Sequence, residues 1–91
     1  MVEEFDDFLV VFLSNNHATY VFNELRKKGV EIEIVTTPCK ISSGCSQSIR
    51  FKEVYRNRIK QVIKKLNVPT KGIYRLKKVD WIIEYVFLEN I

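Results

Sequence analysis

A chain of 91 residues, 46% of them hydrophobic, can form one small core but not two, which excludes a second domain of ordinary size. Its formal charge of +4 favours anionic partners, although it falls far short of the charge density of a histone-like protein. The charge is unevenly distributed, because residues 50–78 hold eleven basic residues and one acid, whereas residues 1–7 hold four acids.

The start of the chain argues for a cytoplasmic protein without membrane contact. It carries acids where a signal peptide needs positive charge, and the apolar run at residues 8–13 is far too short to span a bilayer. Two cysteines in a reducing compartment are typical of free thiols, metal ligands or a redox pair rather than of a permanent disulfide.

The first half of the chain predicts a strand, a helix and a second strand. FLVVFL, residues 8–13, is continuously apolar, as in a central strand. A helix over about residues 17–28 follows, capped by the polar SNN segment and ended by Gly29. The alternation of EIEIVT, residues 31–36, predicts a half-buried strand that Pro38 ends.

The second half continues the pattern. QSIRF, residues 47–51, predicts a third strand, an amphipathic helix spans about residues 53–67, and GIYRLK, residues 72–77, is a fourth strand. The order βαββαβ is that of ferredoxin-like α+β folds, in which two helices cover one face of a four-stranded antiparallel sheet. We therefore expect a ferredoxin-like domain at residues 1–78.

The remaining residues, 79–91, form an apolar extension, VDWIIEYVFLENI. Because the strand at residues 8–13 is apolar on both faces, the face away from the helices also needs cover. We expect the extension to pack on that face or to take part in a homodimer.

The hairpin between the second and third strands holds both cysteines, Cys39 and Cys45, six positions apart in a Ser- and Gly-rich turn. Right-handed crossovers place this hairpin at the same sheet edge as the end of the first strand and the start of the first helix. His17, at that helix start, is therefore a predicted neighbour of the loop.

Several short segments together resemble one family, the domains described as "Putative Se/S carrier protein-like". They are TP at 37–38, ISSGC at 41–45, IRF at 49–51, GIYR at 72–75 and HA at 17–18. The chain departs from the family pattern at Cys39-Lys40, where an Arg and an acid are usual, and at Ser46, where Gly is usual. The resemblance implies a carrier of sulfur or selenium that uses the thiol of Cys45, and it gives no support to Cys39.

The residues of the loop fit that chemistry, because a carrier thiol must be exposed and partly ionised to attack sulfane sulfur. Hydroxyl, backbone N–H and cationic groups favour the thiolate by hydrogen bonding and by charge. The candidates for this substrate-binding role are Lys40, Ser42, Ser43, Gly44 and Arg50. The alternative is that Cys45 is a half-buried turn residue without chemistry.

Three residues are candidates for the reaction itself, and each has a structural alternative. Cys45 is the nucleophile, Cys39 is either a resolving thiol or an inert surface thiol, and His17 is either a base for Cys45 or an ordinary helix-start residue. A zinc site from these three would lack a fourth ligand, so no metal or cofactor is expected.

A second function class rests on a row of basic residues, Arg56, Lys60 and Lys64, on the second helix, which Arg58 and Lys65 join. Such a row suits a small basic binding module that docks an acidic protein partner or nucleic acid. Sequence-specific RNA binding is not expected, because the third strand offers only Phe51 for base stacking. We expect a thiol carrier or accessory protein, with a sulfur or selenium donor protein as its partner, rather than a stand-alone enzyme.

Overall fold

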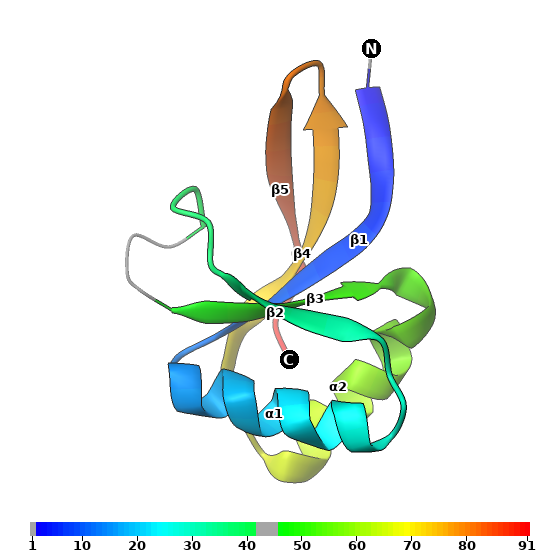
Figure 1. Cartoon of the computed structure of the whole chain (residues 1–91). Coiled ribbons are helices and arrows are strands. Elements are labelled where there is room, and N and C mark those ends of the chain that lie inside the picture. Colours follow the sequence, from blue (N-terminus) through cyan, green and yellow to red (C-terminus); the bar gives the residue numbers. More distant parts are fainter. Residues whose placement is uncertain (1, 42–45) are drawn as a thin grey trace.

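The computed structural model describes residues 2–41 and 46–91, with side chains from residue 7 onward. Figure 1 shows both helices on one side of a twisted sheet. The elements in chain order are β1 (Val2–Phe12), α1 (Asn15–Lys27), β2 (Ile32–Thr36), β3 (Gln47–Lys52), a 3-10 turn (Glu53–Tyr55), α2 (Arg56–Leu66), β4 (Thr70–Val79) and β5 (Ile82–Glu89). Within this described part, neither α1 nor α2 has the length and apolar character needed to cross a membrane.

The sheet has the strand order β2-β3-β1-β4-β5, and each pair of neighbours is antiparallel. The predicted α+β class is therefore confirmed, with β1 at the centre of the sheet. The predicted number of four strands is wrong, because the sheet has a fifth strand. The ferredoxin-like assignment stays a prediction.

The fifth strand is formed by the C-terminal extension. Val79 pairs with Ile82, so that only Asp80 and Trp81 connect β4 to β5. Asp80 has a φ of 55°, the left-handed conformation that tight hairpin turns require. The extension thus continues the sheet along the outer edge of β4, where it satisfies backbone groups that would otherwise be unpaired.

Residues with side-chain or backbone properties suited to helix ends determine where α1 begins and ends. The Ser14 side chain accepts a hydrogen bond of 3.2 Å from the backbone N–H of His17, which confirms Ser14 as the N-cap. Gly29 follows the helix with a φ of 75°, and the N–H of Val30 then donates to the carbonyl of Leu25 over 3.2 Å. The chain thereby turns back under the sheet and buries Val30 in the core.

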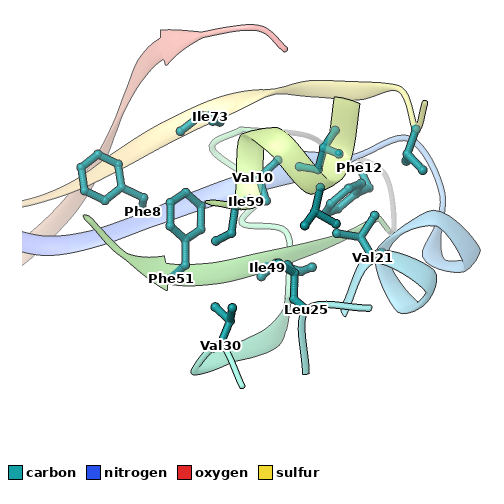
Figure 2. Close-up of a cluster of buried hydrophobic side chains, with 14 residues drawn as sticks. Phe8, Val10, Phe12, Val21, Leu25, Val30, Ile49, Phe51, Ile59 and Ile73 are labelled. Carbon is teal, nitrogen blue, oxygen red and sulfur yellow. The ribbon is translucent and has the colours of Figure 1, made fainter. Parts of the chain in front are cut away.

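The core fills the space between the sheet and the helices, as Figure 2 shows for the labelled side chains of both layers. Phe8, Val10 and Phe12 alternate along β1 toward the helices and are almost completely buried. Phe8 stacks on Phe51 with 5.7 Å between the ring centroids. Each buried side chain of this size contributes roughly 1.5–3 kcal/mol to folding.

The opposite face of the sheet is also buried at its centre. Leu9 and Val11, which alternate with the core residues of β1, have exposed fractions of 2% and 0%. Tyr74, the partner of Leu9 in the β1–β4 pairing, meets Phe87 edge to face at 5.4 Å. Aromatic side chains of β4 and β5 therefore lie on the face that the helices leave open.

Candidate thiol site

The hairpin that carries the cysteines has a rigid base. Beyond the last strand pair, the N–H of Thr37 donates to the carbonyl of Ser46 over 3.0 Å. The hydroxyls of Thr37 and Ser48 lie 2.6 Å apart in a hydrogen bond, and both residues are buried. The points at which the loop leaves and re-enters the sheet are thus fixed by hydrogen bonds.

The first part of the loop is a tight turn. The carbonyl of Pro38 accepts a hydrogen bond of 2.9 Å from the N–H of Ile41, which leaves Cys39 and Lys40 at the two central positions. Cys39 is an exposed free thiol. The Lys40 ammonium group donates to the backbone carbonyl of Ile83 over 3.0 Å, so this side of the loop lies beside β5, as Figure 1 shows.

Cys45 itself, with Ser42, Ser43 and Gly44, lies outside the described residues. The next residue, Ser46, is 7% exposed, and its hydroxyl is buried without a hydrogen-bond partner in the described part of the chain. A buried hydroxyl of this kind can still donate one hydrogen bond.

His17 lies at the same end of the sheet as the hairpin. The pairing of Val11 with Ser48 brings the end of β1, and with it the start of α1, to the hairpin end of β3 (Figure 1). His17 is partly buried, and its Nδ1 atom has no hydrogen-bond partner among residues 7–41 and 46–91. The topology thus places one ring nitrogen with free hydrogen-bonding capacity at this end of the molecule.

Arg50 lies three residues beyond the start of β3 and is engaged by carboxylates. Its Nε donates to Asp7 Oδ2 over 3.1 Å, a second guanidinium nitrogen contacts the same oxygen, and Glu33 lies 3.9 Å away. Lys52 binds the other oxygen of Asp7. The positive charge of Arg50 is therefore compensated within the sheet.

Asp7 was not among the residues that the sequence singled out, although it is only 5% exposed. Burial raises the pKa of its carboxyl group, but the hydrogen bonds and charges of Lys52 and Arg50 outweigh burial and hold the pKa below its ordinary value. No pattern in the sequence marks this cluster, because it depends on the register that places Asp7 opposite Lys52 across β1 and β3.

The predicted basic row on α2 is divided by the fold. Arg56 and Lys60 bind the carboxylate of Glu89, at 2.6 and 2.8 Å, whereas Lys64 has no ion pair in the described part of the chain. Hydrogen bonds from Lys60 and Arg56 lower the pKa of Glu89. Two of the three cations therefore attach the end of β5 to the helix layer.

The described residues contain no group of three or more His, Cys, Asp or Glu side chains that could hold a metal ion. What they define is a small α+β domain that presents the hydrogen-bonded base of a loop, with the exposed thiol of Cys39, at one end of its sheet.

Comparison with known proteins names the class of this domain. A family model described as "Putative Se/S carrier protein-like" matches residues 7–75, and the chain belongs to that family. The match runs from the buried part of β1 to the middle of β4 and includes the whole thiol loop. None of the curated proteins and none of the solved structures that were compared matches the chain.

Proposed function

We propose that this protein carries sulfur or selenium as an adduct of the Cys45 thiol and hands it from a donor protein to an acceptor. The family match carries the proposal, because it spans the complete loop around Cys45. Cys39, six residues away in the same loop, is exposed, and this supports the proposal that a partner protein can reach the loop. The proposed role is that of a cytoplasmic carrier built on a ferredoxin-like domain rather than that of a stand-alone enzyme.

The proposed transfer is a thiol exchange without net oxidation. The Cys45 thiolate attacks the terminal sulfur of a donor persulfide, R–S–SH. A new S–S bond forms at Cys45, the donor S–S bond breaks, and the donor leaves as R–S⁻ with the electron pair. Attack by an acceptor thiolate on the terminal sulfur of the Cys45 persulfide repeats the same step and releases the Cys45 thiolate.

Neighbouring residues take supporting parts in this proposal. Lys40 and the hydroxyl and N–H groups of Ser42, Ser43 and Gly44 favour the anionic form of the thiol, and His17 accepts its proton. Outside the transfer cycle, Cys39 resolves a Cys45 that a peroxide has oxidised to the sulfenic acid: the Cys39–Cys45 S–S bond forms, the S–O bond breaks and water leaves, and a thiol reductant later restores both thiols. Arg50 is left out, because its guanidinium group is bonded to Asp7.

Intact-mass measurement tests the proposal. The chain is incubated with a cysteine desulfurase and cysteine, and we expect a mass gain of one sulfur atom that dithiothreitol removes. Cys45→Ser should abolish the gain, whereas Cys39→Ser, the matched control in the same loop, should retain it. A gain that is equal in the wild type and in Cys45→Ser, or no gain in the wild type, would refute the carrier role.

A further inference from the structure

A second candidate site lies on the helix layer, distinct from the thiol loop. One face of α2 and the C-terminal end of α1 border an open depression of about 560 Å³, which we call the basic pocket. Its lining residues are Lys28, Arg58, Gln61, Val62 and Lys65. The four residues from α2 follow the i, i+3, i+4, i+7 spacing of a single helix face.

The basic pocket gathers three cationic side chains without a compensating acid among the described residues. Arg58, Lys65 and Lys28 form no ion pair within the described residues, and no acidic residue lines the depression. The other face of α2 differs, because there Arg56 and Lys60 share the carboxylate of Glu89. The fold thus neutralises one set of cations and leaves the other set open to solvent.

The position of Arg58 is electrostatically unfavourable for the helix. Arg58 lies in the first turn of α2, which contains no acidic residue, so its charge adds to the positive end of the helix dipole. Lys65, in the last turn, and Lys28, at the end of α1, are favourably placed for their own helices, yet both border the same depression. An anion in the pocket would stabilise Arg58.

We propose that the basic pocket binds a compact polyanion with adjacent phosphoryl groups. Each phosphoryl group carries a charge of about −1.5 to −2 near neutral pH. Two such groups therefore balance the total charge of the three cations, whereas a single carboxylate balances only one of them. The planar guanidinium group of Arg58 suits bidentate contact with phosphate oxygens, and the amide of Gln61 supplies a further donor. The volume lies within the range of small-ligand sites, roughly 300–1,000 Å³.

Nucleic acid fits the pocket less well. A strand needs a track of several phosphate contacts, usually with aromatic side chains on which bases stack. Arg56 and Lys60, which would extend the track along α2, are bound to Glu89, and the lining residues include no aromatic side chain.

Titration of the full chain with inorganic pyrophosphate at constant ionic strength tests the proposal. Amide chemical shifts should change around Lys28, Arg58 and Lys65 and should saturate with a dissociation constant below about 1 mM, as a specific charge-assisted site requires. Arg58→Gln and Lys65→Gln should each weaken binding about fivefold or more. Lys64→Gln, which removes the same charge one residue outside the pocket, should change it less than about twofold.

Three results would overturn the proposal. They are shifts that grow linearly without saturation, equal effects of Lys64→Gln and Lys65→Gln, and tighter binding of a single-stranded oligonucleotide or a polyglutamate peptide than of pyrophosphate. The substituted side chains are exposed, so each variant should fold, and thermal unfolding monitored by circular dichroism is the check. Because the shift mapping uses the unmodified chain, saturation and the location of the shifts can be judged even if a variant does not fold.

Discussion

Among the side chains that the structure describes, Asp7 is the charged one that is buried, with 5% of its surface exposed. Its carboxylate is almost completely buried, but Arg50 and Lys52 keep it ionised by hydrogen bonding to both of its oxygens. Removal of that charge would leave Lys52 without this partner and Arg50 with only the more distant carboxylate of Glu33, at 3.9 Å, and a charge that loses its partner costs more than a neutral group at the same place.

We predict that Asp7→Asn lowers the free energy of unfolding by about 1–3 kcal/mol at pH 7. Because the pKa of Asp7 is lower in the folded chain than its ordinary value of 3.8, the stabilisation is complete above that value and is lost as the pH falls through the folded-state pKa. Urea unfolding should therefore show the same difference in the free energy of unfolding between wild type and variant at pH 7 and pH 5, and a smaller difference at pH 3.

Glu31→Gln is the matched control for this experiment, since Glu31 is an exposed acid on the same side of the molecule without an ion pair in the described part. It should change stability little at any pH. A deficit of Asp7→Asn that stays constant from pH 7 to pH 3 would contradict the assigned charge interaction.

Some residues of the candidate site could be placed from the sequence and others could not. The position of His17 at the hairpin end of the sheet follows from the order of elements, because the crossover rule leaves no other place for the start of α1. The partner of Arg50 could not be predicted, since it depends on which residues of β1 and β3 stand opposite each other. Composition and spacing do not determine that register.

At the scale of single elements, the paired strands β4 and β5 approach each other closely at a glycine of β4, Gly72. Gly72 has a φ of 125°, and a Cβ atom at this position would lie 2.6 Å from Cε1 of the Phe87 ring and 3.2 Å from the carbonyl oxygen of Glu89. A glycine inside a strand commonly marks such a close approach. The Phe87 ring can therefore occupy its position only because residue 72 has no side chain.

We predict that Gly72→Ala lowers the free energy of unfolding by at least about 2 kcal/mol, through both steric overlap and backbone strain. In a Phe87→Ala background the same change should cost less, because the ring contact is gone while the strain remains. Denaturant unfolding of the two single variants and the double variant measures this coupling. Equal costs of Gly72→Ala in both backgrounds would show that the ring plays no part.

The two helices and the existence of the first four strands could be predicted from apolar runs and periodicity, but β1 (Val2–Phe12) begins six residues before the predicted strand at 8–13, and β4 (Thr70–Val79) extends two residues beyond each end of the predicted strand at 72–77. The predicted helix at residues 17–28 differs by one or two residues from α1, Asn15–Lys27, because Ser14 proved to be the cap among three adjacent candidates. The fifth strand was missed because IIEYVFLE is apolar on both sides and has no clear alternation. Its turn, with Asp80 at positive φ, is not one of the Asn-Gly or Asp-Gly pairs that announce a hairpin.

At the scale of the whole molecule, Glu89 joins two layers. It ends β5 at the edge of the sheet and binds Arg56 and Lys60 of the helix layer. Apart from this attachment, the β4–β5 hairpin exposes large apolar side chains, among them Trp81 at 95% exposed and Phe87 at 54%. Because exposed apolar side chains contribute little to holding β5 in place, the ion pairs of Glu89 should help to keep the end of β5 against the helix layer.

We predict that Glu89→Gln lowers the free energy of unfolding by about 0.5–1 kcal/mol and increases amide hydrogen exchange at the end of β5 more than in β3. The effect should shrink at high salt, which screens exposed ion pairs, and it should vanish below the lowered pKa of Glu89. Glu84→Gln on the same strand, where the exposed carboxylate has no ion pair in the described part, serves as control. Equal exchange in the two variants would rule out the anchor.

The central place of β1 also determines when the chain can fold during its synthesis. β1 is made first, yet its two neighbours, β3 and β4, begin only at Gln47 and Thr70. Until Thr70–Val79 has left the ribosome, a nascent chain holds the apolar FLVVF segment with one edge unpaired, and such an edge can pair with other chains. We therefore expect cooperative folding to wait for β4, and the unpaired edge of β1 to be a point of contact with other chains until then.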